Sequence, residues 1–134
     1  RGGQKLEAPI TLTDLYATFA NVSGTKLEEP RDSVDMLECL RGKGPSRHEM
    51  VYHNGLGQLG IRQGDWVLLL ESGGKSEPAW RKEIFGIQSP DAKVQLFNFA
   101  TDIRQRQNQA SKHPEKVKEL TTRLEKIRQP RRND

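Results

Sequence analysis

Residues 60–70, GIRQGDWVLLL, and residues 96–102, LFNFATD, decide how this chain folds. The first stretch predicts a strand, a tight turn at Gln63-Gly64 and a second strand opened by Asp65-Trp66, because glycine is a usual residue of short hairpin turns. The second stretch predicts a strand that runs into a polar turn. Together they indicate a sheet whose neighbouring strands run antiparallel.

The strand at residues 66–70 is apolar at every position, which indicates a central strand covered on both faces. One cover is a predicted final helix that begins at Pro114, a residue favoured in the first helical turn. Its apolar residues recur at spacings of three and four, which predicts one narrow stripe that packs on Leu59, Ile61 and the 66–70 strand. The stripe consists of Val117, Leu120, Leu124 and Ile127.

Two shorter helices are predicted before the sheet. The first covers residues 11–22, where Thr11 and Asp14 have the spacing of a capping box and Ser23-Gly24 gives a left-handed stop. Its apolar stripe is Leu12, Leu15, Tyr16 and Phe19. In the second, Asp32-Ser33 is the expected cap and Gly42 the expected end, with Met36, Leu37 and Leu40 between them.

Strands grouped together and followed by a helix predict an α+β fold. We expect a four-stranded, mainly antiparallel sheet with a C-terminal helix on one face, preceded by two short helices. Residues 72–93 form a long Gly/Ser/Pro-rich segment, a type of loop that is commonly functional or disordered.

The charge is uneven, because residues 101–134 hold ten Lys or Arg against five Asp or Glu. A basic end can bind a polyanion such as nucleic acid or sulfated glycan. Acidic residues interleave with the basic ones in the predicted helix, which favours a solvated helix surface and makes a nucleic-acid partner the weaker interpretation. A single cysteine, Cys39, excludes an internal disulfide and is expected to be buried. The sequence contains no run of eighteen apolar residues, the length that a membrane-spanning helix requires.

Several short motifs do not meet the requirements of a nucleotide-binding, metal-binding or catalytic site. Residues 55–60 spell G-x-G-x-x-G, but a strand and turn follow where a nucleotide site needs a helix. His48, His53 and His113 lack metal-ligand spacing, and no paired carboxylates or Ser-His-Asp order appear. We therefore expect no catalytic residue and no metal ligand in this chain. His53 and Asn54 lie where a strand gives way to a loop, a common place for residues that contact ligands.

Five segments together resemble the C-terminal subdomain of the type I sulfatases, the formylglycine-dependent arylsulfatases of the alkaline phosphatase superfamily. They are the 60–70 hairpin, the strand and turn from 96 through Asn108, the sequence HPE at 113–115, TDLYATF at 13–19, and DSVDMLECL at 32–40. The chain departs from the family pattern at Glu38, Val67, Ile103 and Gln109, where Pro, Lys, Pro and Leu are usual.

The resemblance implies that the parent protein hydrolyses sulfate esters with a formylglycine and one calcium ion, and is periplasmic or secreted. Residues 43–47, KGPSR, end like the family's C-x-P-S-R signature, but Lys43 stands where the precursor cysteine would be. This chain is then a C-terminal piece without catalytic residues or cofactor, inactive alone. Residues 1–45 are the expected end of the large domain, 46–130 the subdomain and 131–134 a disordered tail.

By resemblance the partners are the parent's large catalytic domain and, through it, a sulfated small molecule or glycan. His53 and Asn54 are the expected substrate-binding residues, at the rim of the parent's active site. The apolar first helix should pack on the large domain, and an isolated chain is expected to self-associate through residues 10–22. The alternative is a small binding module for sulfated glycan or nucleic acid that acts through the basic C-terminal helix.

Overall fold

The computed structural model forms two units, Arg1–His48 and Glu49–Asp134. The structure describes residues 3, 5–29, 32–53, 59–70, 83–84 and 92–129. Most of the 72–93 segment, Asn54 and the 131–134 tail therefore lie outside the described residues. None of the helices described has the length and apolar character that crossing a membrane would require.

The first unit contains helix α1, Asp14–Ser23, which starts and stops through local chemistry. The carboxylate of Asp14 accepts a hydrogen bond from the Thr11 backbone N–H at 2.9 Å, which is the back-reaching half of a capping box. At the other end Gly24 has a φ of 71°, so the predicted left-handed stop is confirmed.

Polar contacts hold the buried face of α1. Its buried residues are Asp14, Ala17 and Thr18. The N–H of Ala17 donates to the Ser33 hydroxyl at 2.8 Å, and the Thr18 hydroxyl accepts from the Met36 N–H at 3.0 Å. Three of the four residues of the predicted apolar stripe, Leu12, Tyr16 and Phe19, are exposed in this chain.

Helix α2, Leu37–Leu40, is capped differently from the prediction. Asp35 accepts the hydrogen bond from the Leu37 N–H at 2.9 Å, and Ser33 is occupied with α1, so the expected Asp32-Ser33 cap was wrong. Gly42 follows the helix with a φ of 75°. Cys39 is buried, as predicted.

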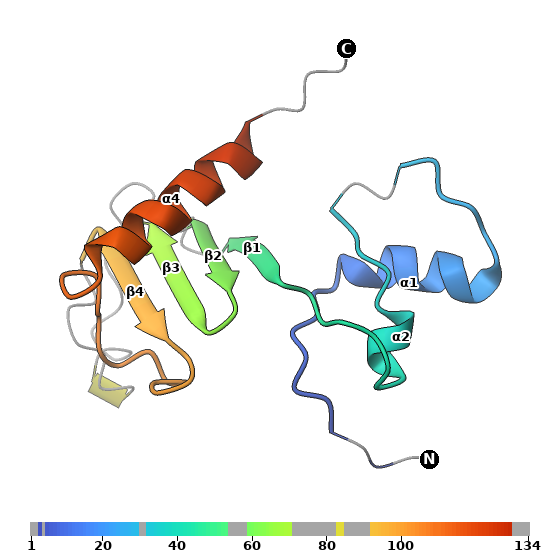
Figure 1. Cartoon of the computed structure of the whole chain (residues 1–134), viewed down its shortest axis with the longest axis horizontal. Helices are drawn as coiled ribbons and strands as arrows, with labels where there is room; N and C mark the ends of the chain where they lie inside the picture. Colours follow the sequence, from blue (N-terminus) through green and yellow to red (C-terminus); the bar gives the residue numbers. More distant parts are fainter. Residues whose placement is uncertain are drawn as a thin grey trace. The chain divides into compact units, whose positions relative to one another are not determined.

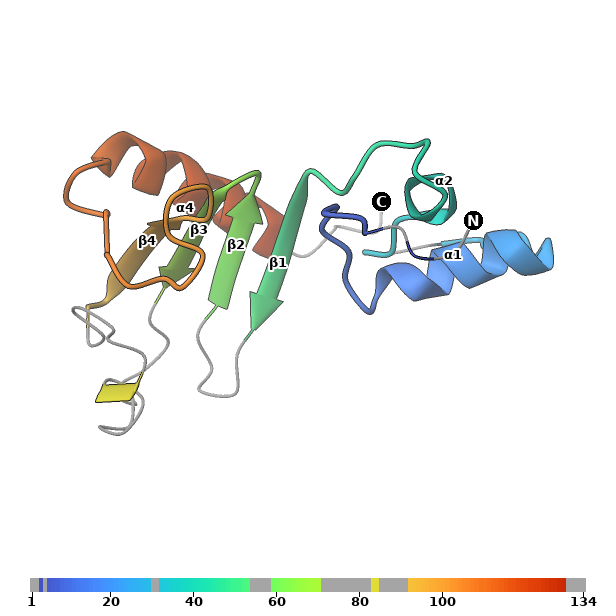
Figure 2. The same ribbon diagram turned by 90° about the horizontal axis from the view of Figure 1, so that it is seen from below.

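The second unit is a four-stranded sheet with one helix across it (Figures 1 and 2). Its strands follow the chain in order, and every neighbouring pair is antiparallel, which confirms the predicted fold class. They are β1 Glu49–His53, β2 Leu59–Gln63, β3 Trp66–Leu70 and β4 Val94–Asn98.

The β2–β3 turn lies one residue later than predicted. Gln63 pairs with Trp66, which leaves Gly64 and Asp65 as the two turn residues. Gly64 has a φ of 57°, and a glycine at the first central position is typical of a type II′ hairpin turn. The positive φ therefore sets the register of the hairpin.

Helix α4, Pro114–Arg128, closes the core on one face of the sheet. Leu120 and Leu124 are fully buried against Ile61, Leu68 and Leu96, as the spacing predicted. Ile127 is 39% exposed, so its assignment to the buried stripe was wrong. It lies in the last turn of the helix, beyond the leucines that meet the sheet.

The opposite face of the sheet is buried as well, which confirms β3 as a central strand covered on both sides. Val67 and Phe97 pair across β3 and β4 and are each about 1% exposed. On β2, a Cβ built on Gly60 would lie 2.8 Å from the Tyr52 ring. Glycine at this position leaves the space that the partly buried Tyr52 ring fills.

Candidate functional site

His53 occupies the end of β1, where it pairs with Leu59 of β2 and its side chain is exposed. Its register places it on the same face as Val51 and Glu49, because side chains two apart in a strand point the same way. Asn54 lies outside the described residues. The structure therefore places one of the two expected substrate-binding residues, at an accessible strand end.

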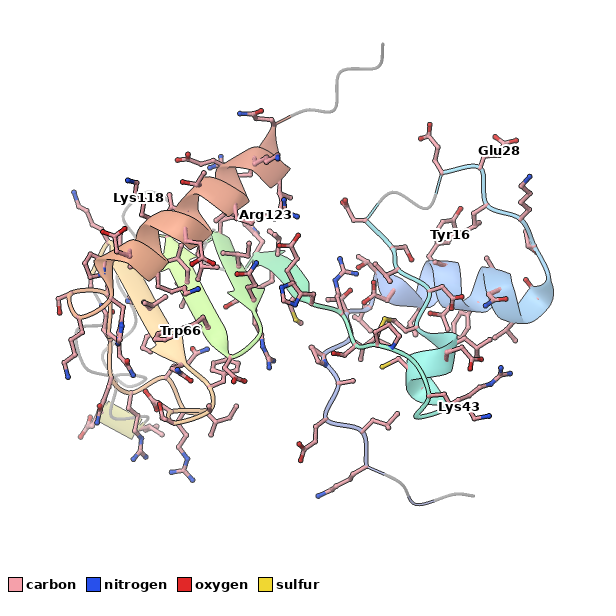
Figure 3. The ribbon with its side chains drawn as sticks, in the orientation of Figure 1. Tyr16, Glu28, Lys43, Trp66, Lys118 and Arg123 are labelled. Carbon is pink, nitrogen blue, oxygen red and sulfur yellow. The ribbon has the colours of Figure 1, made fainter. Side chains whose placement is uncertain are left out.

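Lys43 is exposed on the turn that follows α2, and Figure 3 labels it there. Its backbone N–H donates to the Glu38 carbonyl at 2.9 Å, which continues the end of the helix. Arg47, the last residue of the KGPSR segment, forms an ion pair with Asp14 and donates to the Asp32 carbonyl at 3.1 Å. This segment holds the first unit together in the present chain.

Asp14 is the electrostatic centre of that arrangement, and its side chain is fully buried. Burial raises the pKa of this carboxyl, but hydrogen bonds from Thr11 and from the Val34 N–H, together with the Arg47 charge, outweigh it. The net result is a pKa below the ordinary value. Asp14 is thus an ionised structural residue that joins three separate segments of its unit.

Asn108 covers the outer edge of β4 with its side-chain amide. Its Oδ1 accepts from the Leu96 and Ala110 N–H groups at 3.0 Å each, and its Nδ2 donates to the Val94 carbonyl at 3.0 Å. Next to it, the Gln109 N–H donates to the Leu96 carbonyl at 2.8 Å. One side chain and one peptide therefore replace a fifth strand, which protects an otherwise open sheet edge.

Two contacts fix the ends of the loop between β4 and α4. The ring of His113, at the start of α4, meets Trp66 edge-on with centroids 5.0 Å apart. The His113 side chain does not cap the helix through a hydrogen bond, and its ring packs against Trp66. The Arg62 guanidinium lies 4.9 Å from the centre of the Phe99 ring.

The same loop forms an open hollow of about 440 Å³ on the surface of the second unit. Arg104 and Arg106 both line it and are both exposed. Gln105 between them has a φ of 55°, the left-handed region that residues other than glycine rarely enter. The other lining residues are Thr101, Asp102, Ile103, Gln107 and Gln109. The sequence showed these residues only as a polar turn.

A second hollow lies in the first unit, between α1 and the segment that follows it. Figure 3 shows Tyr16 and Glu28 on its two sides. It is lined by Tyr16, Thr25, Lys26, Leu27, Glu28 and Glu29. Among the described residues of both units, no group of three His, Cys, Asp or Glu side chains could hold a metal ion.

No protein-family model matches this chain, but known proteins resemble it in sequence and in fold. An N-acetylgalactosamine-6-O-sulfatase of Bacteroides thetaiotaomicron is 31% identical over 127 residues, which cover 92% of this chain and 24% of that protein. Human steryl-sulfatase is 36% identical over 56 residues, which cover 40% of this chain and 10% of that protein. This chain is similar in sequence and fold to the C-terminal region of sulfatases.

Solved structures agree with this assignment. A Bacteroides thetaiotaomicron protein from work on the metabolism of multiple glycosaminoglycans is 28% identical, with a TM-score of 0.70 over 85% of this chain and 24% of its own. A protein solved with its substrate D-glucosamine-2-N,6-O-disulfate has the same fold, with a TM-score of 0.60 at 18% identity over 90% of this chain and 25% of its own. The chain spans about a quarter of the length of the N-acetylgalactosamine-6-O-sulfatase.

Proposed function

We propose that this chain is the C-terminal subdomain of an enzyme that hydrolyses sulfate esters, in which it serves as scaffold and as part of the substrate rim. The observation that carries the proposal is the 127-residue match to an N-acetylgalactosamine-6-O-sulfatase. The sheet and α4 supply the scaffold, because their buried leucines make a core that belongs to this unit alone.

The formylglycine and the calcium ion that the family resemblance implies do not fit the residues of this chain. Formylglycine requires a cysteine, and the position that corresponds to it holds Lys43, while Cys39 is buried. The described residues offer no cluster of metal ligands. We assign both groups to the remainder of the parent enzyme and none of the chemical steps to this chain.

His53 and Asn54 are the residues that we propose for the substrate rim. His53 is exposed at the end of a strand whose other residues are at least partly buried, so the sheet holds its backbone while its ring stays accessible. A neutral imidazole can donate one hydrogen bond and accept another, which suits the hydroxyls and sulfate oxygens of a substrate.

The exposed face of α1 supports a large catalytic domain as the protein partner. Tyr16 is 59% exposed and Phe19 62% exposed, and large apolar side chains rarely remain together on a free surface. The N-acetylgalactosamine-6-O-sulfatase has about three quarters of its length outside the matched region, enough for a large domain that could cover this helix. In an isolated chain, self-association through residues 10–22 would bury the same apolar side chains.

The alternative function, a binding module that acts through the basic last helix, has less support. The apolar side of α4 is docked on the sheet, and two of its cations are already engaged. Lys116 pairs with Glu119 at 2.6 Å, and Arg123 forms a two-pronged ion pair with Glu49 of β1. Figure 3 shows Lys118 and Arg123 on different sides of the helix, so these two cations do not share one face.

Turnover of an aryl sulfate with calcium present tests the proposal. The complete parent protein should hydrolyse it, and this 134-residue chain alone should not. In the parent, His53→Ala should raise KM more than it lowers kcat, since a rim residue contributes to binding of the ground state and the transition state alike. Lys118→Ala is the matched surface control. A parent without turnover, or turnover by the chain alone that persists through purification, would refute the proposal.

A further inference from the structure

The hollow beside β4 presents two arginines that the described residues leave without an acidic partner. Arg104 and Arg106 both line it, whereas four other cations form ion pairs within the described residues. Arg41 pairs with Glu38 at 2.7 Å, and Lys116 pairs with Glu119 at 2.6 Å. Two guanidinium groups that lie two residues apart in one turn, and that have no acidic partner among the described residues, can bind an anion together.

The turn that carries these arginines is held in one conformation. The Asp102 N–H donates to the Asn98 carbonyl at 2.8 Å, and the Gln105 N–H donates to the Asp102 carbonyl at 3.0 Å. The Asp102 carboxylate accepts from the Gln107 N–H at 2.8 Å. A rigid backbone reduces the entropy that a ligand must remove when it orders the arginine side chains.

The left-handed conformation of Gln105 is a second, independent sign of a functional turn. Its φ of 55° is the one positive value outside glycine among the described residues. Such conformations persist where the surrounding hydrogen bonds enforce them, and they cluster at ligand sites. In this turn the conformation lies between the two arginines, so both belong to one short loop.

The lining residues define the chemistry of the ligand. Planar guanidinium groups bind tetrahedral oxyanions through paired hydrogen bonds. Thr101 and Gln107 provide a hydroxyl and an amide for ligand hydroxyls, and Ile103, which is 70% exposed, provides an apolar contact for the C–H face of a sugar ring. The hollow has the volume of a small-molecule site.

We propose that the loop between β4 and α4 is a subsite for a sulfated saccharide, in which Arg104 and Arg106 bind one sulfate group of the chain. The inference rests on the proposed function, because a sulfatase region implies a sulfated ligand, and it adds a site that is not part of the His53 rim. Acidic peptides and free sulfate share only the charge with this ligand. They lack the hydroxyls and ring faces that the other lining residues would contact.

The 134-residue chain, labelled with ¹⁵N and titrated by NMR, tests the subsite. The probes are a hexasaccharide of chondroitin sulfate, the same hexasaccharide after chemical desulfation, and sodium sulfate at equal ionic strength. The sulfated hexasaccharide should shift the amide signals of residues 101–109. The desulfated hexasaccharide and sodium sulfate should each bind at least about tenfold more weakly, because each retains only part of the contacts.

Two double variants of equal charge provide the control. Arg104→Gln with Arg106→Gln should weaken binding of the sulfated hexasaccharide about 10- to 100-fold. Lys118→Gln with Lys126→Gln removes the same charge from the exposed side of α4 and should change binding less than about threefold. All four side chains are exposed, so both variants should fold, and their unperturbed ¹⁵N spectra check this.

Equal losses in the two double variants, shifts centred on α4, equal binding of the desulfated hexasaccharide or of sodium sulfate, or no binding would each overturn the subsite. Turnover of an aryl sulfate by the complete unsubstituted parent is measured separately. If turnover is present and the hexasaccharide does not bind, the subsite fails and the sulfatase function stands. If turnover is absent, the function fails whatever the titration shows.

Discussion

Replacement of Asn108 by alanine should destabilise the second unit by about 2–4 kcal/mol. The substitution removes three hydrogen bonds, two from the Leu96 and Ala110 N–H groups and one to the Val94 carbonyl. Each such bond contributes about 0.5–1.5 kcal/mol, and the groups left behind are partly shielded from water at the edge of β4. Asn98→Ala is the matched control, because its side chain makes one exposed bond to the Ala100 N–H. The control should cost less than about 1 kcal/mol.

Urea unfolding followed by far-UV circular dichroism gives the change in free energy for Asn108→Ala. In thermal unfolding, a loss of 2 kcal/mol lowers Tm by about 8 °C or more in a domain of this size. Hydrogen exchange supplies the local readout, because the Leu96 and Ala110 amides should lose protection before amides in the middle of β3. If Asn108→Ala matched Asn98→Ala in stability and left both amides protected, the inference that this side chain seals the sheet edge would be refuted.

Three further substitutions test other parts of the structure. Leu120→Ala should lower the free energy of unfolding by about 3 kcal/mol, because Leu120 is fully buried, whereas the exposed Ile127→Ala on the same helix should lower it by less than about 1 kcal/mol. Equal losses of free energy in urea unfolding would contradict the docking of α4. Burial raises the pKa of Tyr52 from 10.0 to about 12, so the stabilising contribution of its neutral phenol is complete below pH 10 and is lost as the pH rises through 12. Absorbance at 295 nm should report this titration, and Tyr52→Phe should reduce the loss of stability at alkaline pH. Asp14→Asn should destabilise the first unit by about 3 kcal/mol at neutral pH, since it removes the buried carboxylate charge that pairs with Arg47. Because the pKa of Asp14 is lowered, the stabilising contribution of its carboxylate is complete above pH 3.8 and is lost as the pH falls through the folded-state pKa. Acid titrations that remain the same in both proteins would argue against this ion pair.

Periodic patterns predicted the second unit well. The spacing of Leu120 and Leu124 predicted which face of α4 is buried, and the unbroken apolar run predicted that β3 is covered on both sides. The hairpin at Gly64 was predicted one residue early, because sequence alone does not decide which residue beside a turn glycine begins the next strand. In the structure the positive φ of Gly64 and the pairing of Gln63 with Trp66 decide it.

Interactions between distant residues escaped the sequence analysis. Asp14 and Arg47 are 33 positions apart, so no local pattern pairs them, and their ion pair joins the start of α1 to the segment that follows α2. Asn108 lay within the motif that resembles sulfatases, which was the available signal, but its contact with Val94 depends on the folded turn. The role of His53 and Asn54 in the rim stays a prediction, because Asn54 lies outside the described residues.

The position of α4 in the chain has a consequence for synthesis on the ribosome. The core of the second unit begins with Ile61 of β2 and is completed by Leu120 and Leu124 of the last helix. At translation rates of about 5–20 residues per second, the leucines follow Ile61 by roughly 3–13 s. During that interval the nascent sheet carries an uncovered apolar face, so we expect chaperones that recognise such surfaces to hold it until α4 emerges.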